Sequence, residues 1–167
     1  MRDKDFERLY NAEAAGLFSF LAYRTGDRAL AEDLLADAFE RALRGRARFD
    51  RRRGSEKTWL YAIALNLLRD HARRAAAETR ALERTGAAGE AAEDPAFGGV
   101  EHRDTVQRAL ATLAPEEREA IALRFGADLT VPEIAAVLGE PLTTVEGRVY
   151  RALRKLRGSL GSRREAD

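Results

Sequence analysis

The sequence contains no cysteine and only two histidines, His71 and His102. The lack of cysteine excludes disulfides and thiolate metal sites, and it agrees with the reducing cytoplasm, where we expect this chain to act. No group of histidines and carboxylates has the spacing of a zinc site. The sequence also lacks a Gly-x-x-x-x-Gly-Lys-Ser/Thr phosphate loop and a serine in a nucleophile setting. We therefore expect no metal, no cofactor and no enzymatic activity.

Long apolar runs are missing as well. No window approaches the roughly 18 consecutive apolar residues of a membrane span, and the first residues, MRDKDFERLY, lack the apolar core of a signal peptide. No run shows the period of two that is typical of a strand. Apolar residues instead recur at helical spacing, with breaks near Gly26 and at residues 45–55. The sequence therefore predicts an all-α fold.

Helical spacing is lost between residues 82 and 103, where alanine, glycine and glutamate dominate. This composition indicates a flexible linker. We therefore predict two small helical domains, at residues 1–81 and 104–160, followed by a polar tail at 161–167.

The formal net charge of +1 hides a strong segregation of charge. Residues 41–57 carry eight basic and two acidic side chains, and residues 142–164 carry seven basic and one acidic. The stretches 1–40 and 82–119 are acidic, with nine acidic side chains each against five and four basic ones. Two basic blocks indicate two places where a polyanion could bind.

Cap signals in the C-terminal part predict two helices separated by a short turn. Thr130 with Glu133, and Thr143 with Glu146, have the spacing of capping boxes, and Gly139 lies between them. A short helix, a turn and a longer helix form the helix-turn-helix arrangement. The short helix is expected to bury Val131, Ile134, Ala135 and Leu138.

The longer helix is amphipathic. Its apolar face consists of Val145, Val149, Ala152, Leu153, Leu156 and Leu160. Its opposite face consists of Thr144, Gly147, Arg148, Arg151, Arg154 and Lys155. Such a face is commonly just solvated, but this one lacks interleaved glutamates, and small residues occupy its N-terminal turn. DNA contact is therefore favoured, with Arg148 and Arg151 able to read guanine edges and Arg154, Lys155 and Arg157 placed for phosphates.

The same segment, residues 113–157, also carries a longer motif. Its residues are Leu129, Thr130, Glu133, Ile134, Ala135, Thr144, Val145 and Arg148. They resemble region 4 of bacterial RNA polymerase sigma factors, which reads the −35 promoter element. Thr143, Glu146 and Gly147 replace the glycine, lysine and serine that are common in that family. The resemblance implies −35 contacts by Thr143, Thr144, Glu146, Gly147, Arg148, Arg151, Arg154 and Lys155.

The N-terminal part carries a second motif. Its residues are Ala31, Glu32, Asp33, Leu34, Asp37, Phe39, Trp59, Leu60, Ile63, Ala64, Asn66, Asp70 and Arg73. They resemble region 2 of the small extracytoplasmic-function sigma factors of the sigma-70 family. Region 2 and region 4 together cover nearly the whole chain, and their joint spacing is more specific than either motif alone.

An acidic ridge is predicted on the helix that Asp27 is placed to cap. Asp33, Asp37 and Glu40 lie on one outer face, whereas Leu35, Phe39 and Ala42 are expected to face inward. A solvated face is the alternative, but carboxylates repel phosphate, so a protein partner is favoured. The resemblance implies docking of this helix on the β′ clamp helices of core RNA polymerase. The β flap is a further polymerase contact that the resemblance implies for the chain. The implied polymerase-binding residues are Asp33, Ala36, Asp37 and Glu40, and Ala36 stands where the family usually has glutamine.

The loop at residues 44–58 mixes arginines with one aromatic residue. Single-stranded DNA is held by cations along its backbone and by aromatic surfaces for unstacked bases. We expect Phe49 and Ser55 to shape a base pocket, and the phosphate contacts to come from Arg51, Arg52, Arg53 and Lys57. A disordered basic loop is the alternative. The resemblance implies capture of a base flipped out of the −10 element during promoter melting.

The helix after this loop presents a ridge of Trp59, Ile63, Asn66, Asp70 and Arg73. The resemblance implies −10 contacts by Trp59, Asn66 and Arg73. Alternatively, Asn66 and Asp70 brace the helix packing and Asp70 pairs locally with Arg73; the sequence leaves both interpretations open. Leu65 replaces an arginine that often precedes the asparagine, so one cationic contact is expected to be missing.

Together these patterns predict a sigma factor that binds core RNA polymerase and melted and duplex promoter DNA. An anti-sigma factor is a possible further partner. The alternatives are a stand-alone helix-turn-helix regulator and a protein-only adaptor. A regulator would need a dimerisation or ligand domain in the N-terminal half, where the sequence instead offers an acidic ridge and a basic loop.

Overall fold

A computed structural model describes residues 1–84, 106 and 108–161, the side chains of residues 160 and 161 excepted. Helices and their connections make up the whole described part of the chain, with no strand in it. The chain divides into two compact units, Met1–Ala96 and Phe97–Asp167. The predicted all-α fold with two helical domains is therefore confirmed. Of the predicted linker, residues 82–84 end a helix and 85–103 lie outside the described residues, as do 162–167 of the tail.

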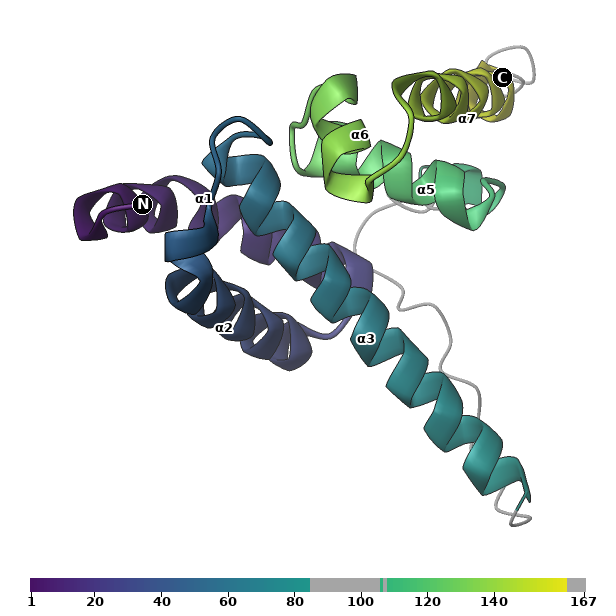
Figure 1. Cartoon of the computed structure of the whole chain (residues 1–167). Helices are drawn as coiled ribbons and strands as arrows, with labels where there is room; N and C mark the ends of the chain where they lie inside the picture. Colours follow the sequence, from purple (N-terminus) through teal and green to yellow (C-terminus); the bar gives the residue numbers. More distant parts are fainter. Residues whose placement is uncertain (85–105, 107, 162–167) are drawn as a thin grey trace. The chain divides into compact units, whose positions relative to one another are not determined.

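The first unit contains three long helices, shown in purple to teal in Figure 1: α1 (Asp3–Thr25), α2 (Arg28–Gly45) and α3 (Glu56–Arg84). Gly26, with φ of 62°, ends α1, because glycine adopts this left-handed conformation without steric cost. Its amide donates to the carbonyl of Ala22 at 2.9 Å. The carboxylate of Asp27 then accepts from the amide of Leu30 at 3.1 Å and caps α2, as predicted. The two helices therefore form a tight hairpin.

The three helices enclose one apolar core. Phe20 of α1 and Tyr61 of α3 meet edge to face, with ring centroids 5.7 Å apart. Burial raises the pKa of the Tyr61 hydroxyl. Leu65, which stands where the resembling motif often has arginine, is 1% exposed. The position faces the core, so an apolar side chain fills it. The other large, fully buried side chains of this unit are Leu17, Leu21 and Leu60.

The packing of α2 follows the predicted pattern. Phe39 and Ala42 are buried and Leu35 is half-buried, while the predicted acidic ridge is exposed. The helix α3 differs along its length, since residues 60–68 are mostly buried and residues 71–84 are all exposed. In Figure 1 this exposed end of α3 runs beyond α1 and α2. The N-terminal half of α3 therefore packs on α1 and α2, and its C-terminal half is exposed.

The second unit contains α5 (Pro115–Ile121), the π-helical turn η2 (Ala122–Gly126), α6 (Val131–Leu138) and α7 (Leu142–Gly161). The predicted box at the start of α6 is present: the amide of Thr130 donates to Glu133 at 2.8 Å, and the amide of Glu133 donates to the Thr130 hydroxyl at 3.4 Å. Gly139, with φ of 68°, ends α6. The predicted helix-turn-helix is therefore formed by α6 and α7.

The second predicted capping box is wrong. The helix α7 already begins at Leu142, and the carbonyl of Pro141 accepts from the amides of Thr144 and Val145 at 3.0 and 3.3 Å. Thr143 therefore lies within the first turn and not at the N-cap. The register of the turn, set by Gly139 and Pro141, starts the helix before the threonine.

The apolar faces of α6 and α7 meet in the core of this unit. Val145, Val149 and Ala152 of α7 are buried, and Leu153 and Leu156 are half-buried, as predicted; the side chain of Leu160 is outside the described residues. In α6 the structure buries Ile134, Ala135 and Val137, while Val131 and Leu138 are half-buried. The helix has only eight residues, so its ends are less covered than its middle.

Truncation of Leu65 to alanine is expected to lower the free energy of unfolding of the first unit by about 2–5 kcal/mol, because it leaves a cavity in the core. Urea unfolding of the full chain, followed by the fluorescence of the single tryptophan, Trp59, measures this change. The matched control is Leu43→Ala on α2, whose side chain is 40% exposed. Equal unfolding midpoints for the two variants would contradict the assignment of Leu65 to the core.

Candidate nucleic-acid and protein interfaces

The predicted acidic ridge lies on the outer side of α2. Asp33, Ala36, Asp37 and Glu40 are all exposed. Glu40 forms an ion pair with Arg44 one turn later. Asp33 and Asp37 have no ion-pair partner within the described part of the chain, so their charge is open to an external cation. On α1 the exposed ring of Tyr10 packs on the buried ring of Phe39, with ring centroids 4.7 Å apart. The ridge therefore presents two carboxylates, unpaired among the described residues, which suit a protein partner with basic side chains.

The basic loop after α2 is fixed to the start of α3 by aromatic contacts. It begins with the 3₁₀ turn η1 (Arg46–Arg48), and Phe49 then packs on Trp59 with ring centroids 5.3 Å apart. A Cβ at Gly45 would lie 3.4 Å from the Trp59 ring, so this ring also packs against the backbone of Gly45. The loop therefore has defined contacts, in contrast to the alternative of a disordered basic loop.

The last residues of the loop cap α3. The hydroxyl of Ser55 accepts from the amide of Thr58 at 3.1 Å, and the hydroxyl of Thr58 donates to the carbonyl of Ser55 at 2.8 Å. Gly54 precedes them with φ of 155°, and a Cβ there would lie 2.7 Å from the Thr58 hydroxyl oxygen. This close approach requires glycine. Ser55 therefore has a structural role beside the predicted one.

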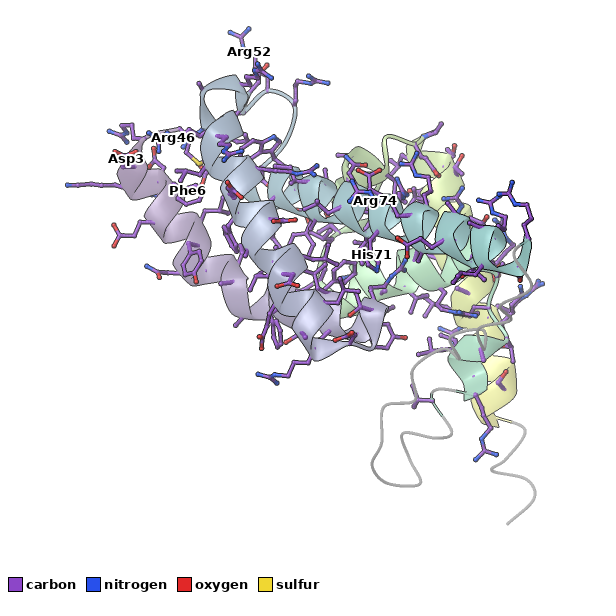
Figure 2. The ribbon with its side chains drawn as sticks, turned by 90° about the horizontal axis from the view of Figure 1, so that it is seen from below. Asp3, Phe6, Arg46, Arg52, His71 and Arg74 are labelled. Atoms are coloured by element: carbon purple, nitrogen blue, oxygen red, sulfur yellow. The ribbon has the colours of Figure 1, made fainter. Side chains whose placement is uncertain are left out.

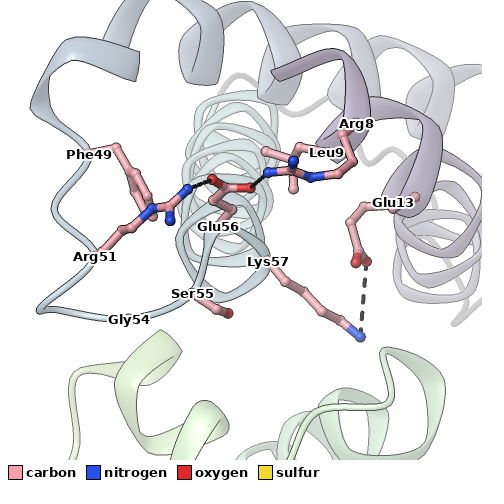
Figure 3. A pocket seen from close by; sticks show the side chains of 10 residues that line it. Arg8, Leu9, Glu13, Phe49, Arg51, Gly54, Ser55, Glu56 and Lys57 are labelled. Carbon is pink, nitrogen blue, oxygen red and sulfur yellow. Dashed lines mark hydrogen bonds and ion pairs between the residues drawn. The ribbon is translucent and has the colours of Figure 1, made fainter. Parts of the chain in front are cut away.

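A pocket of about 540 Å³ opens between α1, this loop and the first turn of α3 (Figure 3). Of the predicted loop residues, Phe49, Arg51, Ser55 and Lys57 line the pocket. Arg52 and Arg53 do not line it; both are exposed, and Figure 2 shows Arg52 at the outer end of the loop. The remaining lining residues are Arg8, Leu9, Ala12, Glu13, Gly54 and Glu56.

Ion pairs hold the rim of the pocket together. The Glu56 carboxylate lies 3.2 Å from the Arg51 guanidinium and 3.6 Å from that of Arg8, and Lys57 lies 4.0 Å from Glu13 (Figure 3). Arg8 and Glu13 could not be predicted from the sequence, because they lie on α1, more than 40 residues from their partners Glu56 and Lys57, without a local motif. Arg51 is 73% exposed, so an incoming phosphate can compete with Glu56 for it.

The residues of the predicted ridge on α3 differ in their exposure and in their partners. Trp59 is half-buried against the loop, whereas Asn66 is exposed. Arg73 donates to Asp70 at 2.8 Å, so the local ion pair of the sequence interpretation is present. Asn66 and Asp70, both described, show no hydrogen bond to each other. The amide of Asn66 is therefore available to a ligand.

The predicted reading face of α7 is only partly open. Thr143, Thr144 and Glu146 are exposed in its first turns, and Arg154 is exposed farther along. Arg148 has only 18% of its side chain exposed, because its guanidinium pairs with Glu140 of the turn at 2.6 Å. This pair fixes the turn against the helix. The geometry thus gives Arg148 a structural contact that the sequence did not predict.

A second carboxylate, Glu117 at the start of α5, contacts two further cations of α7, Lys155 and Arg151. Its side chain is 7% exposed; Lys155 donates to it at 2.8 Å, and Arg151 lies 3.8 Å away. The hydrogen bond from Lys155 lowers the pKa of this carboxyl, against the opposing effect of burial. A Cβ at Gly147 would lie 3.1 Å from the Arg151 guanidinium, so a small residue leaves room for that side chain.

Two further properties concern only the described residues. Within them, histidine and acidic side chains form no group of three that could hold a metal ion. None of the described helices combines the length and the apolar character needed to cross a bilayer.

Two family models match the chain: Sigma-70 region 2 over residues 9–78 and Sigma-70, region 4 over residues 103–156. The ECF RNA polymerase sigma factor BldN of Streptomyces coelicolor is 32% identical over 158 residues, which make up 90% of this chain and 58% of BldN. RNA polymerase sigma factor CarQ of Myxococcus xanthus is 32% identical over 157 residues, 93% of this chain and 89% of CarQ. The chain thus spans under two thirds of the first relative and most of the second.

Two solved structures are similar to the chain over nearly its full length. The sigma factor RpoE of Bartonella quintana, solved in complex with the anti-sigma factor NepR, gives a TM-score of 0.72 at 26% identity. The match covers 95% of this chain and 98% of the RpoE chain. CnrH, solved in complex with the cytosolic domain of CnrY, gives a TM-score of 0.66 at 28% identity. The match covers 96% of this chain and 90% of the CnrH chain.

Replacement of Gly54 by alanine is expected to destabilise the first unit by about 1–3 kcal/mol, because its φ is strained for an L side chain and the new Cβ meets Thr58. The Trp59 emission should also shift as the Phe49 contact loosens. Urea unfolding and emission spectra of the full chain measure both effects.

The matched control for this loop variant is Gly16→Ala on α1, where the new Cβ meets only ordinary contact, 3.5 Å from the Tyr61 hydroxyl. This control should be neutral or stabilising by up to about 1 kcal/mol, because alanine favours a helix over glycine. A Gly54→Ala chain with wild-type stability and emission would show that the loop does not depend on this glycine.

Proposed function

Because the chain belongs to the sigma-70 family of bacterial RNA polymerase sigma factors, in the extracytoplasmic-function group, we propose how its surfaces share the work of promoter recognition. It binds core RNA polymerase, directs it to −10 and −35 promoter elements and promotes DNA melting. The family is one of transcription initiation factors. In our proposal the polymerase performs all catalysis, and the chain acts beside it in the cytoplasm without enzymatic activity of its own.

The polymerase contact is proposed for the acidic ridge of α2. Its open carboxylates, Asp33 and Asp37, repel DNA phosphates and attract the cations of a protein surface, which we propose to be the β′ clamp helices. Ala36 lies between them and presents only a methyl group, where an amide is usual. The contact therefore depends on the charges of these two carboxylates.

The −10 contact is proposed for the pocket of the first unit. Flipping one base out of a duplex costs a few kcal/mol, which a preformed pocket offsets. The pocket offers an aromatic wall in Phe49, backed by Trp59, and cations at its rim in Arg51 and Lys57. Arg52 and Arg53 lie outside it and are assigned to the DNA backbone. Asn66 and Arg73 of α3 are proposed to extend the contact beyond the pocket.

The −35 contact is proposed for α7. Its small first-turn residues allow close approach to base edges in the major groove, with Thr143, Thr144, Glu146 and Gly147 nearest. Arg154 contacts phosphate, and Arg151 and Lys155 reach the DNA while remaining beside Glu117. Arg148 supports the reading turn through Glu140. The β flap is the proposed polymerase contact of this unit.

One observation carries this function: the first unit holds both an open acidic ridge and a preformed pocket with cations and an aromatic wall. A stand-alone helix-turn-helix regulator has no need of either. The test is run-off transcription with core RNA polymerase, a promoter fragment and the full chain. Specific transcript that depends on the chain supports the proposal, and duplex binding with no effect on initiation favours the regulator.

An anti-sigma factor is proposed as a further partner. One similar structure is the sigma factor RpoE in complex with the anti-sigma factor NepR, and the other is CnrH in complex with the cytosolic domain of CnrY. A protein that covers α2 or α7 in this chain would block the polymerase or the DNA contact.

The charge reversal Asp33→Lys is expected to weaken binding to core polymerase by at least about tenfold, because it places like charges together at the contact. Co-sedimentation or fluorescence anisotropy with core polymerase measures the affinity. The control is Glu78→Lys, the same reversal on the exposed end of α3. Unchanged polymerase affinity in the Asp33 variant would remove the ridge from the contact.

The substitution Arg154→Ala should lower affinity for promoter duplex several-fold and reduce the salt slope of log K by about one, since one phosphate contact is lost. Polymerase affinity should stay unchanged. Arg80→Ala, the same loss of charge on the exposed part of α3, is the control. Loss of polymerase binding in the Arg154 variant would contradict the assignment of this residue to DNA contact.

A further inference from the structure

Glu117 joins the beginning of α5 to the DNA-facing helix α7 across 38 residues of sequence. Its carboxylate accepts from the amide of Ala114 at 3.1 Å and from Lys155 at 2.8 Å. The guanidinium of Arg151 lies 3.8 Å away. The residue itself is 5% exposed, so it is the buried acid of this unit among the described residues. Nothing in the local sequence around Glu117 indicates this role.

A buried carboxylate is costly unless it is paired, and removal of its partners would leave an uncompensated charge. Glu117 has two cationic neighbours and a backbone donor, so it is ionised and held in place at neutral pH. Lys155 and Arg151 are in turn held near their positions on α7, with 44% and 55% of their side chains still exposed. Both cations are therefore paired within the protein and remain reachable by an external anion.

This pairing has a consequence for DNA binding. The sequence-independent affinity of a protein for DNA grows with the number of phosphates its cations neutralise and the counterions thereby released. A cation already neutralised by a carboxylate adds less to this affinity. Lys155 and Arg151 of α7 form ion pairs with Glu117, and Arg148 forms an ion pair with Glu140. Three of the four cations of the predicted reading face thus carry an internal counter-charge.

We propose that Glu117 is a positioning residue of the recognition helix that restrains sequence-independent DNA binding. It orients Lys155 and Arg151 for a duplex in the correct register, and it competes with the phosphates of any other duplex for the same two cations. This inference rests on the proposed contact between α7 and promoter DNA. A buried acid thus raises the ratio of promoter affinity to random-duplex affinity, while the first turns of α7 read the bases.

The test compares Glu117→Gln with Glu116→Gln in the full chain. Glu116 is the exposed neighbour on the same turn of α5, so both variants lose one negative charge at nearly the same place. Fluorescence anisotropy measures affinity for two duplexes, one of random sequence and one promoter fragment that supports run-off transcription, from about 50 to about 200 mM salt.

For Glu117→Gln we expect several-fold tighter binding to the random duplex and a salt slope steeper by about one to two, since one or two cations are released to phosphate. The ratio of promoter to random affinity should fall. Glu116→Gln should show less than half of each effect. Addition of Lys155→Gln to the Glu117 variant should return the slope toward the wild-type value.

Identical slopes for the two glutamine variants would overturn the proposal, as would weaker binding of Glu117→Gln to both duplexes with unchanged slope, which is the result of a purely structural role. If circular dichroism shows that Glu117→Gln does not fold, the single variant Lys155→Gln is measured instead. Its salt slope should differ from the wild-type slope by less than that of Arg154→Ala. An equal change in the two variants would overturn the proposal. A wild-type chain that binds neither duplex and yields no transcript would instead refute the proposed function.

Discussion

Pairing of basic side chains with carboxylates of the same chain governs both candidate DNA surfaces. Glu56 lies between Arg8 and Arg51 at the pocket, and Glu117 lies between Arg151 and Lys155 at the recognition helix. Two roles follow from one interaction. Each carboxylate fixes side chains that are otherwise flexible, so less ordering remains to be done when DNA binds. Each also lowers the charge that a random phosphate meets. The near-zero net charge of the chain is thus distributed so that attraction to DNA depends on geometry.

The apolar packing decides where these pairs can form. The hairpin of α1 and α2 and the start of α3 share one core, in which Phe20 meets Tyr61. This core brings the first turns of α1 beside the basic loop, and the stacking of Phe49 on Trp59 holds the loop against α3. A pocket that takes residues from positions 8 to 57 exists only in the folded unit. In the second unit, burial of Ala152 and its neighbours places α5 against α7, which brings Glu117 to Lys155.

Much of this arrangement could be predicted from local patterns, because caps and amphipathic faces depend on residues a few positions apart. The cap at Asp27, the box at Thr130 and the exposed acidic ridge are of this kind. The second box at Thr143 was mispredicted because Pro141 supplies the first acceptor and starts α7 earlier. Glu117 and Arg8 could not be found in this way. Their partners are separated from them by 38 and more residues, and only the tertiary packing brings them together.

The two carboxylate systems differ in burial, and this difference predicts different behaviour toward DNA. The pair of Arg51 with Glu56 is open to solvent on the arginine side, so it contributes little stability and is screened by salt. A phosphate of single-stranded DNA can therefore pair with Arg51 at small cost, which suits the −10 contact proposed for this pocket. Glu117 is buried, and separation from Lys155 would leave its charge unpaired. Under the proposed roles, α7 consequently keeps its shape when duplex DNA binds, while the loop at residues 44–58 exchanges the Glu56 carboxylate for a phosphate.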